Sequence, residues 1–290
     1  MNTFQQQEWI DEANRHILAA LANEPELTKA IIFKGAWILN LHLKDHRHSG
    51  DLDANADYEW AAATPDLVTQ KEFFEKTVDR AVTRYFERQS PVRFTVTETE
   101  VTVHPLRAHP RNWNAFLIKV RLKDALNPDT TGLPAVQIDV AAPERLGAHA
   151  VTTMEFFGAP ANVYTLNRIA GEKLRAYLTS LPQYRAKMKG GYRAFRVKDL
   201  FDQARILRAC PIENTEFWNA AVEEFKLACE SRLVDCAGPE TFFQEWALAE
   251  KAYTSDATLR RIPFAEAESA LKIIITYLAE KKMFPLSYPR

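Results

Sequence analysis

Two aspartates, Asp51 and Asp53, are separated by a single leucine in the segment Asp51-Leu52-Asp53. In a strand, residues two apart point to the same face, so both carboxylates would lie side by side while Leu52 points into the core. Carboxylate oxygens suit Mg²⁺, which keeps several waters and bridges to substrate phosphates. The spacing makes Asp51 and Asp53 candidate metal ligands. The alternative is a solvated strand end, since this motif also occurs in ordinary loops.

A third carboxylate on a neighbouring strand would complete a two-metal site of the polymerase type. Asp139 has an apolar residue on either side in the strand-like segment 136–140, so it is the best candidate for this third metal ligand. Before the aspartate pair, an apolar run over 30–33 ends in Lys34-Gly35, and a helix-like pattern follows. Glycine at a helix N-terminus lets the backbone approach a phosphate, which the free N–H groups favour.

The apolar periodicity predicts which elements hold these residues in place. Spacings near 3.6 predict helices over 4–22, 35–43 and 66–86. Alternation over 92–104 predicts a hairpin with its turn at Glu98, and two more strands are expected at 115–122 and 135–141. After Thr165 only helices are expected, at about 165–180, 196–209, 212–233, 239–254 and 264–281.

These elements predict an α+β fold, with a mixed sheet and flanking helices followed by a C-terminal helical domain. The expected domains are 1–160 and 161–290. The 290 residues carry a net charge of −1, which excludes a globally basic nucleic-acid-binding protein. Three cysteines without a CxxC pair argue against a disulfide framework. With no secretory signal and no apolar run of about 18 residues, we expect a cytoplasmic protein without a membrane partner.

The motif as a whole resembles a known family. Phe33-Lys34-Gly35, a helix, and then Arg47-x-Ser49-x-Asp51-Leu52-Asp53 are similar to the AbiEii/AbiGii-type toxin nucleotidyltransferases, a branch of the DNA-polymerase-beta-like superfamily. The resemblance continues in EKLRA (172–176) and RVKDLFD (196–202). The chain departs from the family in having Ala36-Trp37 in place of Gly-Thr, and Lys198 in place of an arginine before Asp199.

The resemblance implies a Mg²⁺-dependent nucleotidyltransferase of a toxin–antitoxin or phage-defence system. It would transfer a nucleotide from an NTP to an acceptor hydroxyl, the tRNA 3′ end in some relatives, and its usual partner is an antitoxin. The implied roles are Lys173 at the triphosphate and Asp199 as an active-site carboxylate, with Asp202 one turn further on. Lys34, Gly35 and Ser49 would also contact the nucleotide. Without the resemblance, Lys173 is interpreted as a surface lysine paired with an acid, and Asp199 and Asp202 as residues that cap a helix.

Basic residues concentrate between 168 and 208, where eleven Lys or Arg face only Glu172, Asp199 and Asp202. Interleaved tyrosines offer rings for base stacking. The local imbalance of charge within a neutral protein favours an RNA or nucleotide contact over a solvated charged face. The candidate RNA-binding residues are Arg185, Lys187, Lys189, Arg193 and Arg196. A second, weaker basic patch consists of Arg107, Arg111, Lys119, Arg121 and Lys123.

Three further possibilities stay open at this point. His42, His46 and His48 are interpreted as a surface cluster, because no HExxH motif or cysteine partner accompanies them, and a zinc site is the alternative. The same chemistry could use a protein hydroxyl as acceptor. Alternatively, the chain could be an inactive nucleotide- or RNA-binding protein of the same fold.

Overall fold

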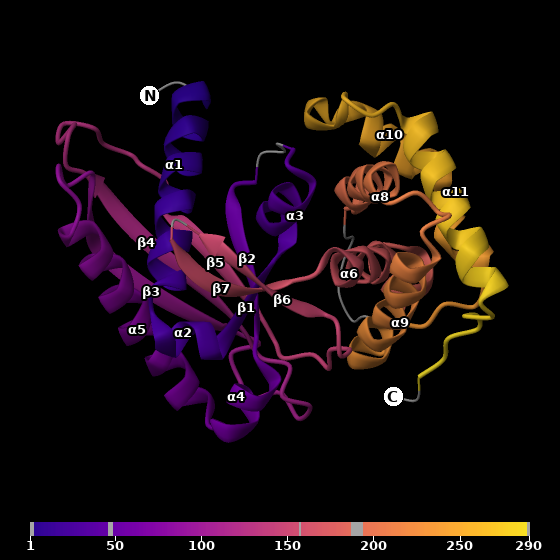
Figure 1. Ribbon diagram of the computed structural model, residues 1–290, viewed down its shortest axis with the longest axis horizontal. Coiled ribbons are helices and arrows are strands. Elements are labelled where there is room, and N and C mark those ends of the chain that lie inside the picture. The colour runs from indigo at the N-terminus through magenta and orange to yellow at the C-terminus, as the bar shows by residue number, and fades with distance from the viewer. Residues whose placement is uncertain (1–2, 46–48, 157, 187–193, 289–290) are drawn as a thin grey trace. The chain divides into compact units, whose positions relative to one another are not determined.

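The computed structural model describes residues 3–45, 49–156, 158–186 and 194–288 (Figure 1). The chain folds into two compact units. Unit 1 consists of Met1–Leu41, His46–Glu144 and Val151–Tyr164, and unit 2 of His42–Asp45, Arg145–Ala150 and Thr165–Arg290.

Unit 1 is built on a seven-stranded sheet in the order β3-β4-β5-β2-β1-β7-β6. The strands are β1 (Ile31–Lys34), β2 (Asp51–Ala56), β3 (Phe94–His104), β4 (Ala115–Asp124), β5 (Val136–Ala141), β6 (Val151–Phe156) and β7 (Ala159–Tyr164). β2 runs parallel to β5 and β1 parallel to β7, while the other neighbours are antiparallel. The predicted mixed sheet is confirmed.

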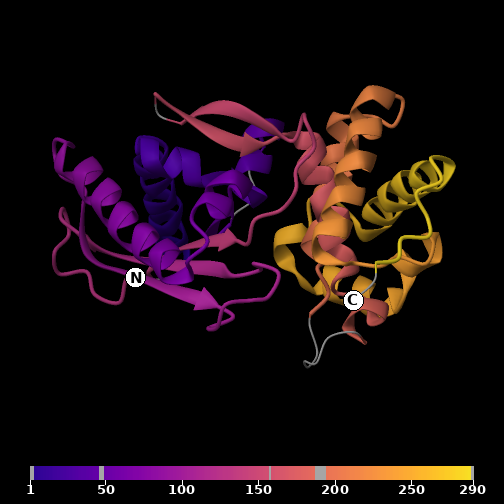
Figure 2. The same ribbon diagram turned by 90° about the horizontal axis from the view of Figure 1, so that it is seen from below.

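Helices cover the sheet of unit 1 (Figures 1 and 2). They are α1 (Thr3–Ala22), α2 (Pro25–Ala30), α3 (Gly35–Leu43), α4 (Tyr58–Ala63) and α5 (Leu67–Glu87). The rings of Trp9 in α1 and Phe86 in α5 both contact Phe94 of β3, so these two helices share one face of the sheet. Leu52 and Ile138 are buried toward the core, and their alternate neighbours therefore point to the opposite face.

Unit 2 is helical, as expected for the C-terminal region. Its elements are α6 (Leu166–Leu178), α7 (Pro182–Arg185), α8 (Val197–Ala209), α9 (Thr215–Arg232), η1 (Pro239–Phe243), α10 (Trp246–Ser255), η2 (Ala257–Leu259) and α11 (Phe264–Glu280). Figure 2 shows α6 and α9 packed side by side, and α8 also contacts α6. The crossing of α6 and α9 depends on Gly171, because a Cβ there would lie 2.5 Å from the backbone nitrogen of Phe225. Across the described part of the chain, no helix is both long enough and apolar enough to cross a membrane.

Two element predictions are wrong. The segment 92–104 is not a hairpin that turns at Glu98, because β3 runs through as one strand with a register shift between Val96 and Glu98. A bulge inserts one residue and interrupts the alternation without reversing the chain. The helix expected over 239–254 is broken into η1 and α10, since Glu245 adopts a left-handed backbone with φ of 51°. The strands β6 and β7 were not predicted.

Candidate active site

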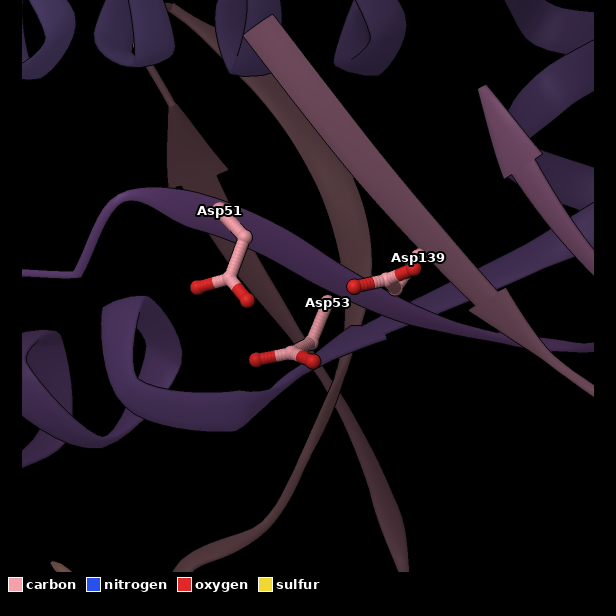
Figure 3. A group of neighbouring side chains, drawn as sticks. All are labelled: Asp51, Asp53 and Asp139. Carbon is pink, nitrogen blue, oxygen red and sulfur yellow. The ribbon is translucent and has the colours of Figure 1, made fainter. Parts of the chain in front are cut away.

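Three carboxylates meet on the sheet face that lies opposite α1 and α5. Asp53 of β2 is in register with Asp139 of β5, and Asp51 lies two residues before Asp53 on the same face. One oxygen from each of the three aspartates lies within 4.8 Å of the others, which is close enough for a shared metal ion. Figure 3 shows the three side chains converging from the two strands. We call Asp51, Asp53 and Asp139 the acidic triad. The structure therefore brings together the three candidate metal ligands.

Gly35 fits against the triad because it lacks a side chain. It begins α3 directly after β1, and Lys34, the last residue of β1, is in register with Asp53. Gly35 has a φ of +77°, and an added Cβ would lie 2.6 Å from the Asp53 Cβ. Both the left-handed backbone and the close approach require glycine. Neighbouring Lys34 is buried, with its Nζ 5.7 Å from the centre of the Tyr164 ring.

Ser49 reaches the triad from the segment before β2. Its hydroxyl donates a hydrogen bond of 2.8 Å to Oδ1 of Asp51. The buried Asn14 of α1 donates from Nδ2 to the Ser49 carbonyl at 3.4 Å, so α1 also helps to position this segment. Arg47, which contributed to the family resemblance, lies outside the described residues, as do His46 and His48.

The electrostatics of the triad are those of a cation site. Burial and the neighbouring Asp51 carboxylate raise the pKa of Asp139, while the charges of His104 and Lys34 act in the opposite direction. Several carboxylates held close together repel one another unless a cation or a proton neutralises them. An oxygen-only donor set favours a hard cation such as Mg²⁺. The residues present thus fit a divalent metal ion.

In unit 2, Lys173 of α6 is paired with both carboxylates of the predicted α8 motif. Its Nζ lies 3.2 Å from Oδ1 of Asp199 and 2.7 Å from Oδ2 of Asp202. Asp199 is 3% exposed and Asp202 is fully buried, so these are interior ion pairs rather than a solvated lysine. The alternative is therefore correct in pairing Lys173 with an acid, but wrong in placing it on the surface. The interpretation of Asp202 as a capping residue is also wrong, because it lies in the second turn of α8.

Arg196, at the N-cap position of α8, holds the second oxygen of Asp199 at 2.6 Å. Burial would raise the pKa of Asp199, but the charges of Arg196 and Lys173 outweigh it and hold this pKa below its ordinary value. In the family pattern an arginine directly precedes this aspartate, and Lys198 stands at that position here. In this chain it is Arg196 that supplies a guanidinium group beside Asp199. Asp199 is therefore ionised at neutral pH.

The sequence did not predict the ion pairs that link Asp202 to Asp45. Arg205 pairs with Asp202 at 3.1 Å and also with Asp45 at 3.1 Å, and Arg261 reaches the other oxygen of Asp45 at 3.0 Å. The i, i+3 spacing of Asp202 and Arg205 on α8 was a usable signal. No local signal links these residues to Asp45, which stands 160 positions earlier than Arg205.

Two of the five candidate RNA-binding residues have partners within the protein. Arg185 pairs with Glu245 and lies 5.5 Å from the centre of the Phe195 ring. Arg196, which pairs with Asp199, is half exposed. Lys187, Lys189 and Arg193 lie outside the described residues. The contact of these five residues with RNA stays a prediction.

Comparison with known proteins places these observations in a family. No curated protein matches the chain. The crystal structure of JHP933 from Helicobacter pylori has the same fold, with a TM-score of 0.52 and 15% identity over 95% of this chain and 93% of that one. The family model for the nucleotidyl transferase AbiEii toxin of type IV toxin–antitoxin systems matches residues 16–288. The chain therefore belongs to the AbiEii nucleotidyltransferase toxin family.

Proposed function

We propose that this protein is a Mg²⁺-dependent enzyme that transfers a nucleotide from an NTP to the 3′ end of tRNA. The observation that carries the proposal is the acidic triad, whose oxygens lie within 4.8 Å of one another on adjacent strands. Asp51 and Asp53 would hold the metal ion, and Asp139 would join them. A divalent ion held by these residues would supply positive charge that neutralises the charge developing on the phosphates during transfer.

The residues around the triad are suited to the nucleotide. Gly35 opens the nine-residue helix α3, whose first N–H groups favour a phosphate. Ser49 would keep Asp51 oriented through its hydrogen bond, and its hydroxyl would contact a phosphate oxygen. Lys34 would add positive charge beside Asp53, the residue with which it is in register.

The roles of the unit 2 residues rest on the family resemblance. Lys173 would contact the triphosphate, and Asp199 would act as an active-site carboxylate. Within unit 2, two carboxylates hold the Lys173 ammonium group, so its position is fixed before any ligand binds. A preorganised cation loses little conformational entropy when it meets a phosphate.

The proposed reaction is a displacement at the α-phosphorus of the NTP. The acceptor hydroxyl oxygen forms the new bond to phosphorus, the bond to the β-phosphate oxygen breaks, and pyrophosphate leaves with the electron pair. The hydroxyl proton passes to solvent. We further propose that Arg185, Lys187, Lys189, Arg193 and Arg196 contact the RNA. The enzyme would act in the cytoplasm, and a cognate antitoxin would restrain it.

The test is transfer from each of four α-³²P-labelled NTPs, with Mg²⁺, into purified tRNA and into total cell protein. The double variant Asp51→Asn, Asp53→Asn removes two proposed ligands with little change of shape, and Asp129→Asn, at an exposed position of unit 1, is the matched control. We expect label in tRNA with wild type and Asp129→Asn, and at least 100-fold less with the double variant. Label in protein alone would refute the tRNA acceptor, and undiminished transfer by the double variant would refute the site.

A further inference from the structure

The loop that joins β3 to β4, residues 105–114, is held together by one buried side chain, that of Asn114. Asn114 accepts a hydrogen bond from the His109 N–H at 2.8 Å. Its Nδ2 donates to the carbonyl oxygens of Pro105, at 2.9 Å, and Arg107, at 3.0 Å. The Asn114 side chain thus holds three backbone groups of the loop by hydrogen bonds, which gives the loop a defined conformation.

The side chains of this loop are aromatic and basic, with His109 and Trp113 partly exposed and Arg107 and Arg111 exposed. The rings of His109 and Trp113 are stacked, with centroids 5.2 Å apart and planes 13° from parallel. The guanidinium carbon of Arg111 lies 5.5 Å from the centre of the Trp113 ring. Arg107, four residues before Arg111, is exposed. Residues 105–114 contain two arginines and no acidic residue, although the chain as a whole has a net charge of −1. The loop therefore combines a stacking platform with positive charge.

The strand register places this loop at the acidic triad. Asp139 of β5 is in register with Leu117 of β4, which in turn pairs with Thr102 of β3. Paired residues share a face, and so does His104, two residues beyond Thr102. Two strand spacings and two residues put His104 roughly 12 Å from Asp139. His104 is the last residue before the loop, so the loop starts from the triad's own face of the sheet.

We propose that the loop 105–114 binds the single-stranded end of the RNA acceptor. An unpaired base would stack on the platform formed by His109 and Trp113, while Arg107 and Arg111 contact phosphates. Stacked rings with interleaved cations are the features that bind single-stranded nucleic acid without sequence readout. This inference rests on the proposed function, because it gives the acceptor strand a binding site beside the proposed metal ligands.

The test measures binding separately from transfer. A fluorescein-labelled hairpin RNA with an unpaired 3′ tail of four nucleotides is titrated with full-length protein, without NTP, and anisotropy gives Kd. We expect Trp113→Ala to raise Kd about tenfold or more, while Trp113→Phe, which keeps a ring, binds within about threefold of wild type. Arg111→Ala should reduce the dependence of log K on log salt concentration by about 0.7, the contribution of one phosphate contact to a single strand.

Arg84→Ala is the matched control, because this exposed arginine lies on α5, which covers the sheet face opposite the triad. It should leave Kd within twofold of wild type, and a blunt-ended hairpin should bind equally to wild type and Trp113→Ala. Thermal unfolding of each variant checks that it is folded. Unchanged Kd for both Trp113→Ala and Arg111→Ala, or no binding of the tailed RNA by wild type, would overturn the proposal.

The outcomes separate this inference from the proposed function. If wild type and Trp113→Ala add nucleotides to tRNA with the same KM for tRNA, the function stands and the loop proposal is wrong. If Trp113→Ala loses binding of the tailed RNA while the control variant keeps it, but wild type transfers no nucleotide to any RNA, the loop proposal stands and the proposed function is wrong.

Discussion

At the residue scale, Gly35 has a left-handed backbone and lies directly against Asp53 of the acidic triad. Its φ of +77° disfavours any side chain, and a Cβ would press against Asp53. We predict that Gly35→Ala destabilises the protein by about 1–2 kcal/mol through the left-handed backbone. Because the methyl group displaces the Asp53 carboxylate, it should also weaken Mn²⁺ binding at least tenfold, measured by isothermal titration calorimetry.

Gly132→Ala separates these two effects. Gly132 has a similar φ of +71°, but nothing lies within 4 Å of an added Cβ. This variant should therefore show a similar loss of stability with unchanged Mn²⁺ affinity. Equal metal affinity in both variants would show that the contact of Gly35 with Asp53 does not matter for the metal.

Asp139 gives a second prediction, on the balance between stability and metal binding. Its carboxylate lies among like charges that repel it in the absence of a cation. Asp139→Asn should therefore raise the melting temperature in metal-free buffer and lower the affinity for Mn²⁺ at least tenfold. A variant that is less stable than wild type without metal, or that binds metal as tightly, would contradict this role for Asp139.

These residues also show how far sequence reasoning reached. Asp51 and Asp53 followed from alternation along one strand, and Asp139 from its apolar neighbours, because strand periodicity determines which face a residue occupies. The two arginines that flank Asp45 could not be predicted, since they are brought to it by the packing of α8 and the segment before α11. The platform of His109 and Trp113 depends on loop hydrogen bonds that no periodicity reports.

At the scale of elements, α8 presents an ionised, buried Asp199 to α6. Replacing it by asparagine leaves Lys173 and Arg196 without that charge, so we predict a loss of about 2–3 kcal/mol in the free energy of unfolding at pH 7. As a control, Glu268→Gln removes the partly exposed i, i+4 partner of the exposed Lys272 on α11, 2.8 Å away, and should cost less than about 0.5 kcal/mol.

The difference in the free energy of unfolding between wild type and Asp199→Asn depends on pH with a definite sign. The pKa of Asp199 is lower in the folded protein than its value of about 3.9 in an unfolded chain. Its stabilisation is therefore complete above that value and is lost as the pH falls through the folded pKa. Measured by urea denaturation, the difference in the free energy of unfolding between wild type and Asp199→Asn should be constant from pH 7 to 5. It should decrease only below about pH 4. Narrowing that begins above pH 5 would contradict a lowered pKa.

The elements themselves were predicted where one periodicity ran without interruption. The helices α1, α3, α5, α6, α8 and α11 begin and end close to their expected residues. The errors arose where a local backbone feature interrupts the pattern. The bulge in β3 imitates a turn at Glu98, and the left-handed Glu245 breaks a helix whose apolar spacing continues through it. Single-residue backbone changes of this kind leave little trace in hydrophobicity.

At the scale of the whole molecule, the proposed catalytic residues belong to two compact units. The triad, Gly35 and Ser49 lie in unit 1, whereas Lys173 and Asp199 lie in unit 2. Family membership covers both, since the match extends over 16–288. Whether unit 2 takes part in nucleotide binding can be tested without assuming any arrangement of the two, because hydrogen exchange reports protection peptide by peptide.

We predict that Mn²⁺ alone slows amide exchange only in the strands that carry the triad, β2 (51–56) and β5 (136–141). Adding an NTP analogue with a methylene bridge between the α- and β-phosphates should extend protection to α6 and α8, because Lys173 and Asp199 then gain a ligand. The analogue cannot undergo transfer, so the bound state persists during exchange. The double variant Asp51→Asn, Asp53→Asn should show neither change. If the analogue protects unit 1 while exchange in α6 and α8 stays the same, the roles assigned to Lys173 and Asp199 are wrong and the triphosphate is held by unit 1 alone.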